Sequence, residues 1–175
     1  MRALIASIEA EYRRYKTLAE GAINQLADPQ LAGATATAGT TGTSNSIVII
    51  VWHLAGNLRS RFTDFLTSDG EKPWRDRDSE FLARHVTRTD LQAKWEDGWR
   101  ALFAALTDLT DAELARTVTI RGQPHTVAEA LHRSLAHTSY HVGQIVYVAK
   151  ALRGADWQSL SIPPGQSAQY NPPSK

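Results

Sequence analysis

Cysteine is absent from the 175 residues of this chain. Its absence excludes a disulfide scaffold, a zinc site built on thiolates and a cysteine nucleophile. A transition metal bound by this chain would therefore take its ligands from histidine, aspartate or glutamate, or from outside the chain.

An excess of one charge is also lacking, because 19 Lys and Arg residues stand against 18 Asp and Glu residues. No block of like charge occurs, which argues against binding to nucleic acid. The longest apolar run, residues 47–52, is far shorter than the stretch of about 20 residues that crosses a bilayer. The N-terminus lacks the apolar stretch of a secretory signal. We therefore expect a cytoplasmic protein that contacts neither nucleic acid nor a membrane.

The length suits one domain, which we expect to span residues 1–175. Apolar residues recur at spacings of three and four in segments that we predict to be helices, namely residues 2–27, 46–66, 89–109 and 126–152. Four such helices in one domain predict an all-α four-helix bundle.

The second of these helices is ambiguous on local grounds. Residues 47–51 are β-branched throughout and favour a strand when taken alone. We predict a helix because apolar residues after His53 have helical spacing, and because Ser44, Asn45 and Ser46 can serve as its N-cap.

Two further helix starts carry polar signals. Thr89 or Asp90 is the expected cap of the third helix. At the fourth helix, Thr126 is followed three residues later by Glu129, which is the spacing of a capping box.

The segments outside the helices differ in character. Residues 32–45 are rich in Gly, Ala and Thr and predict a flexible loop. Residues 67–88 form a long polar connection, whose aromatic residues we expect to hold it against the body. Residues 113–125 predict a short extended hairpin before the last helix. Residues 157–175 contain four prolines and predict a non-helical tail.

His137 and His141 are the most informative pair of polar residues. Side chains four apart on a helix lie one above the other, so two imidazoles can take adjacent positions around one metal ion. His53 follows the most apolar stretch of the chain and is expected to point inward. In a bundle it could meet the other two, although a lone inward histidine is more often a hydrogen-bonded core residue. Three histidines with open positions are typical of a catalytic zinc site rather than a structural one.

The remaining histidines fit such a site less well. His132 lies about 140° around the helix from His137, and His85 and His125 lie in predicted connections, so we expect all three at the surface. A di-iron centre would need two Glu-x-x-His motifs, and only the one beginning at Glu129 is present.

Polar residues one turn from the three histidines could orient an imidazole or a substrate. Asn57 is four residues after His53, and Gln144 is three residues after His141. Polar packing at the mouth of the bundle is the simpler alternative for both. Tyr140 is expected to point off the histidine face into the core or an interface.

Three segments carry a resemblance to a known family: residues 51–58 (VWHLAGNL), 62–74 (FTDFLTSDGEKPW) and 137–145 (HTSYHVGQI). They resemble the DinB/YfiT-like metalloenzyme superfamily and, within it, a subfamily of uncharacterised proteins. The resemblance implies a four-helix bundle of up-down-down-up topology that is often a homodimer. It also implies that His53, His137 and His141 bind a divalent metal ion, with nickel or zinc the foremost candidates.

The reaction is left open by this resemblance. Characterised members of the superfamily include S-transferases and isomerases that use a low-molecular-weight thiol, and others are known only as stress-associated proteins. Three hypotheses follow: a metal-dependent thiol S-transferase acting on a small electrophile, a metal-dependent hydrolase, and a non-enzymatic metal- or ligand-binding stress protein.

Overall fold

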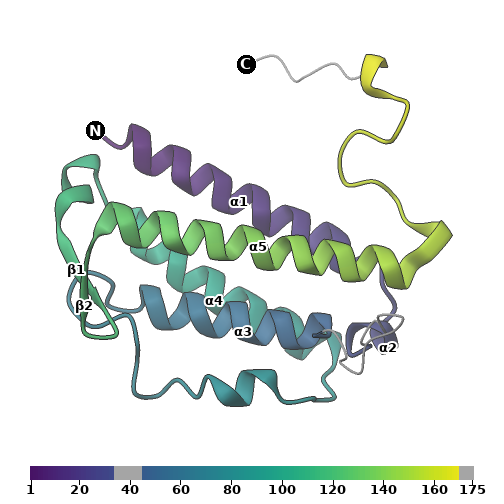
Figure 1. Cartoon of the computed structure of the whole chain (residues 1–175), viewed down its shortest axis with the longest axis horizontal. Helices are drawn as coiled ribbons and strands as arrows, with labels where there is room; N and C mark the ends of the chain where they lie inside the picture. Colours follow the sequence, from purple (N-terminus) through teal and green to yellow (C-terminus); the bar gives the residue numbers. More distant parts are fainter. Residues whose placement is uncertain (34–44, 170–175) are drawn as a thin grey trace.

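The computed structural model of the chain describes residues 1–33 and 45–169. Its long elements within these ranges are the helices α1 (Ala3–Ile23), α3 (Ile47–Phe62), α4 (Arg88–Thr107) and α5 (Val127–Arg153). The predicted all-α bundle is therefore confirmed. In Figure 1, α1 and α5 run in one direction and α3 and α4 run in the other, which is the up-down-down-up order. Helix α1 packs mainly against α5, and α3 packs mainly against α4.

Helix α3 settles the ambiguity of the β-branched segment. The side-chain oxygen of Ser46 accepts a hydrogen bond from the backbone N–H of Ile49 at 3.3 Å, which makes Ser46 the N-cap. Ile47, Val48 and Val51 are buried in the core shared by the helices. Burial against neighbouring helices thus outweighs the weak local preference of these residues for strand.

The contact between α3 and α4 is close at one glycine. A Cβ placed on Gly98 of α4 would lie 2.6 Å from the Cα of Ala55 on α3, which is nearer than side-chain atoms approach a backbone. Glycine at this position therefore lets the two helices pack backbone to backbone and holds α3 against the body of the bundle.

One predicted helix cap is wrong. Thr87 begins α4, with its hydroxyl oxygen accepting from the N–H of Asp90 at 3.1 Å and the Asp90 carboxylate accepting from the N–H of Thr87 at 3.1 Å. Asp90 is therefore the third helical residue of a capping box rather than the cap itself. At α5 the predicted box is confirmed, because the Thr126 oxygen accepts from the N–H of Glu129 at 3.1 Å.

The first predicted helix is shorter than expected. Helix α1 ends at Ile23, and a separate short turn, α2 (Asp28–Leu31), begins with Pro29 near its start. After α5 the chain forms the 3₁₀ turns η3 (Gly154–Asp156) and η4 (Ser167–Gln169). Most of the predicted flexible loop, residues 34–44, lies outside the described residues, as do residues 170–175 of the tail. Among the described helices, none combines the length and apolar character needed to span a bilayer.

The long connection between α3 and α4 covers the outer side of α3 (Figure 1). It contains the 3₁₀ turn η1 (Asp78–Phe81), whose Glu80 is buried. A Cβ on Gly56 of α3 would overlap the Oε1 atom of Glu80, so glycine at this position makes room for the carboxylate. The connection therefore delivers one acidic side chain to the middle of α3.

A two-stranded hairpin precedes α5, as predicted. Strands β1 (Thr117–Ile120) and β2 (Gln123–Thr126) pair antiparallel, after the 3₁₀ turn η2 (Asp111–Ala115). The turn between them uses positive φ angles of 53° at Arg121 and 70° at Gly122. The carboxylate of Asp69 accepts from both of their N–H groups at 2.9 and 2.8 Å, which joins the hairpin to the long connection.

Candidate metal centre

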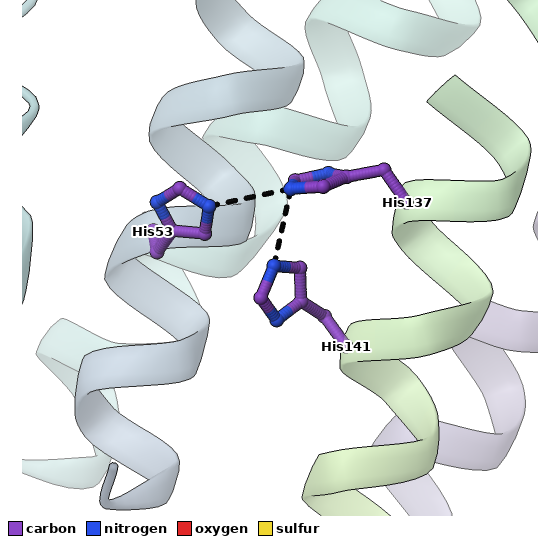
Figure 2. A group of neighbouring side chains, drawn as sticks. All are labelled: His53, His137 and His141. Carbon is purple, nitrogen blue, oxygen red and sulfur yellow. Dashed lines mark hydrogen bonds between the residues drawn. The ribbon is translucent and has the colours of Figure 1, made fainter. Parts of the chain in front are cut away.

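Three histidine side chains meet between helices α3 and α5 (Figure 2). His53 comes from the middle of α3, and His137 and His141 come from successive turns of α5. The Nε2 atom of His137 lies 3.3 Å from Nε2 of His53 and 3.1 Å from Nε2 of His141. The structure thus brings together the three histidines that the sequence singled out, and these residues can hold a metal ion.

The spacing of the nitrogen atoms suits a single small cation. Ligand nitrogens bound at about 2.0–2.1 Å lie about 3.3 Å apart around a tetrahedral ion and about 2.9 Å apart at neighbouring octahedral positions. The two separations that involve His137, 3.1 and 3.3 Å, fall within this interval, and all three ligand atoms lie within 4.8 Å of one another. His53 and His141 are buried and His137 is half-buried, so such an ion would be largely shielded from bulk water.

Hydrogen bonds on the far side of two rings set their orientation. The Nδ1 atom of His53 lies 2.9 Å from Oε2 of Glu80, and the Nδ1 atom of His141 lies 2.8 Å from Oε1 of Gln144. Because both partners are oxygen acceptors, each Nδ1 carries the proton and each Nε2 keeps a lone pair. The lone pairs of His53 Nε2 and His141 Nε2 therefore both face Nε2 of His137. That nitrogen can donate a hydrogen bond to only one of the two. A cation at their centre would satisfy all three nitrogens.

The environment keeps the two histidines of α5 neutral at physiological pH. Burial, followed by the nearby His141 and His53 and then by Arg75, lowers the pKa of His137 to about 3. Burial likewise lowers the pKa of His141 to about 4, although the hydrogen bond that His141 donates to Gln144 acts in the opposite direction. Neutral imidazoles are the form that binds metal, so no proton has to leave these rings near pH 7.

Glu80 and Arg75 form a buried pair behind His53. The guanidinium of Arg75 donates from Nε to Oε1 of Glu80 at 2.8 Å and from Nη2 to Oε2 at 2.9 Å. The side chains of Arg75 and Glu80 are 2% and 7% exposed. Burial alone would raise the pKa of Glu80, but the hydrogen bonds from His53 and Arg75 hold it below its usual value. Glu80 is therefore an ionised carboxylate that accepts a hydrogen bond from Nδ1–H of His53.

Sequence reasoning missed both residues of this pair. Each lies in the polar connection, where acidic and basic residues alternate and nothing local separates a buried carboxylate from a solvated one. The one usable signal was Gly56, a small residue three positions after His53 on the same helix. Phe81, beside Glu80, packs against His53 with the two rings tilted by 38° and their centroids 4.8 Å apart, which adds to this support.

The other predicted residues take various places. Gln144 contacts His141, as described, whereas Asn57 lines a pocket next to the centre. Tyr140 was expected in the core or an interface, and the core alternative is wrong, since the residue is 58% exposed. Its ring packs on His141 at 4.4 Å between centroids, because successive residues on a helix lie only about 100° apart.

The histidines outside the centre lie as expected or close to it. His85 and His132 are exposed, and His125 is half-buried in strand β2. Glu129 caps α5 and takes no part in the centre. Among the described residues, the one group of three or more ligand-type side chains that could hold an ion is His53, His137 and His141.

Fold and site together define a class of protein, an all-α bundle with three histidines gathered between two of its helices. Residues 2–166 match the model of a family described as "Protein of unknown function (DUF1572)". Because the match covers nearly the whole chain, the protein belongs to this family. Comparison with curated proteins and with solved structures gives no match.

Proposed function

We propose that this protein is a DinB/YfiT-like metalloprotein that binds one divalent metal ion, nickel or zinc, through His53, His137 and His141. The observation that carries the proposal is that Nε2 of His137 lies 3.3 Å from Nε2 of His53 and 3.1 Å from Nε2 of His141. The last two nitrogens have lone pairs set by Glu80 and Gln144. A purely structural cluster would offer each ring nitrogen a donor or acceptor of its own. Three imidazole ligands suit both metals, so the metal has to be identified by measurement.

Metal content tests this proposal directly. Protein purified without a histidine tag is analysed by plasma mass spectrometry, alongside His53→Ala, His137→Ala and His141→Ala. We expect about one ion per chain in the unmodified protein and a parallel loss in the three variants. His132→Ala is the matched control, because it removes an exposed histidine from the same helix as two of the ligands. Full metal content in all three variants would overturn the proposal.

For the activity, we propose a metal-dependent S-transferase that joins a low-molecular-weight thiol to a small electrophile. Three protein ligands leave coordination positions open, and a bound ion would lower the pKa of a thiol or water placed there. The chain's own contribution is orientation, since Glu80 and Gln144 fix two of the rings and the helices exclude bulk water. Neutral ligands leave the centre with a net positive charge, which favours a thiolate over a thiol.

Turnover of metal-loaded protein with glutathione, bacillithiol or mycothiol and an aryl halide tests this activity. We expect a thiol-dependent rate that is lost in His53→Ala and retained in His132→Ala. Ester or amide hydrolysis without added thiol would instead identify the hydrolase. Metal binding without either activity would identify a metal-binding stress protein. The homodimer and the cytoplasmic location stay predictions, and the first is checked by light scattering on the purified protein.

A further inference from the structure

A pocket of about 180 Å³ adjoins the histidine centre, and His53 and His137 form part of its wall. Its lining contains five guanidinium groups and no carboxylate, and the arginines come from four separate parts of the chain: Arg61, Arg75, Arg77, Arg121 and Arg133. Helix α3, the long connection, the hairpin turn and α5 each supply at least one of them. This gathering is produced by the tertiary fold, because the net charge of the whole chain is only +1.

The carboxylates around the pocket do not balance these charges. Glu71 pairs with both Arg61, at 3.3 Å, and Arg121, at 2.8 Å. Glu80 pairs with Arg75, as described above. Arg77 has an exposed carboxylate 3.9 Å away, and Arg133 takes part in none of the ion pairs found among the described residues. Asp69, which accepts from the backbone of Arg121 and lies near Arg61, is a fourth carboxylate. Four carboxylates therefore stand against five guanidiniums, which leaves the pocket positive.

Unused hydrogen-bond donors belong to the same pocket wall. Among the described residues, Nη1 of Arg75, Oγ of Ser134 and Nδ1 of His137 are buried and have no hydrogen-bond partner. All three residues line the pocket. The Arg75 and Ser134 groups can donate, and Nδ1 of His137 donates when its Nε2 is a metal ligand. A buried donor without an acceptor is unfavourable, and native structures usually satisfy it with a ligand or water. The missing partner is thus an acceptor, and the surrounding charge makes it an anion.

We propose that this pocket binds a small oxyanion, the carboxylate or phosphate group of the substrate, with Arg75 and Arg133 as its principal ligands. The volume is ample for one such group together with part of the molecule that carries it. His53 and His137 border both the arginine pocket and the proposed metal site. The rest of a molecule whose oxyanion is bound in the pocket would therefore extend toward the metal. That placement rests on the metal site proposed above, whereas binding of the anion by the arginines does not.

Arg75 connects the two sites physically. One edge of its guanidinium holds Glu80, which orients His53, while the remaining Nη1 belongs to the group of unused donors. Its side chain is 2% exposed, so its position is set by packing before any ligand arrives. Arg133 stands one helical turn before His137 on α5, which places its charge next to the centre. A pre-organised guanidinium such as that of Arg75 favours planar or tetrahedral oxyanions over other acceptors.

The test is a calorimetric titration of inorganic phosphate, and separately of succinate, into metal-free protein in a low-chloride buffer. We expect both to bind, with phosphate tighter at low ionic strength because it carries more charge per group. Arg133→Gln should weaken binding by about tenfold, the loss expected for one charge-assisted hydrogen bond. Arg100→Gln is the matched control, since it removes an exposed arginine of α4 that does not line the pocket.

Two further variants keep the outcome decisive. Arg75→Lys retains the charge but removes the unused Nη1 donor, and its melting temperature is measured beside its anion affinity, so that a failure to fold is recognised. His141→Ala is expected to lose metal but to keep anion binding, because His141 does not line the pocket. Equal affinities in the unmodified protein, Arg133→Gln and Arg100→Gln would overturn the proposal. Loss of anion binding in His141→Ala would also overturn it, by assigning the anion to the histidine cluster rather than to the arginine pocket.

Discussion

The change Glu80→Gln tests how far the metal centre depends on the connection that covers α3. The substitution keeps the size of the side chain and removes its charge. The neutral amide can still accept one bond from Arg75, but it no longer offers a carboxylate oxygen to both Arg75 and His53. Two effects follow, one on the fold and one on the metal, and they can be measured separately.

The effect on the fold comes from the buried guanidinium. Removing one partner of a buried ion pair costs about 3–5 kcal/mol, because the other charge stays buried without compensation. We expect the lower end, about 3 kcal/mol, since glutamine retains an acceptor oxygen. For a chain of this length, 1 kcal/mol corresponds to roughly 2–4 °C, so the metal-free variant should melt roughly 6–12 °C lower.

The effect on the metal comes from the orientation of His53. Loss of a partner that fixes a ligating histidine lowers metal affinity by about 10- to 100-fold. Calorimetry with zinc, at a temperature where circular dichroism shows the variant to be fully folded, measures the change in metal affinity separately from the change in fold stability. Glu11→Gln is the matched control, because that carboxylate pairs with Arg14 on the surface of α1, far from the centre in sequence. It should leave both zinc affinity and melting temperature nearly unchanged.

The outcome that would refute this reasoning is equally clear. If Glu80→Gln melts within about 2 °C of the unmodified protein and binds zinc equally well, Glu80 neither stabilises the connection nor orients His53. A lower melting temperature with unchanged zinc affinity would assign Glu80 to the fold only.

Three other results are expected. Burial lowers the pKa of His137 to about 3 and that of His141 to about 4. As pH falls below about 6.5, these two histidines bind protons in the unfolded chain but not in the folded chain. The metal-free protein should therefore lose stability over this range. Allowing for partial solvent access, the free energy of unfolding measured by chemical denaturation should fall by about 1–2 kcal/mol by pH 5. The double variant His137→Ala, His141→Ala should not show this fall. Gly56→Ala should displace Glu80 and weaken zinc binding about tenfold, whereas Gly143→Ala, with no atom within 4 Å of the added Cβ, should keep zinc affinity and gain up to about 1 kcal/mol of helix stability. Zinc at a free concentration of 100 times its dissociation constant should stabilise the protein by about 2.7 kcal/mol, and a chelator should reverse the shift in melting temperature; no shift would contradict metal binding by the folded state.

The sequence by itself determined the helices and half of the candidate centre. Apolar spacing placed the four long helices to within a few residues, because a helix that must bury one face carries that period in its sequence. The capping box at Thr126 and the pairing of His137 with His141 were also readable, since both depend on residues three or four apart. The absence of cysteine already excluded thiolate ligands and left histidine, aspartate, glutamate or ligands from outside the chain.

Only the tertiary structure decided the rest, because the remaining contacts join residues that are distant in the chain. The helical state of residues 47–51 depends on burial against other helices rather than on local preference. The approach of His53 to His137 spans 84 positions, and the bond from His53 to Glu80 spans 27. The arginine pocket combines four parts of the chain whose charges look balanced in the sequence. Local periodicity reports which face of an element is buried, whereas the partners of that face are set by how the elements pack.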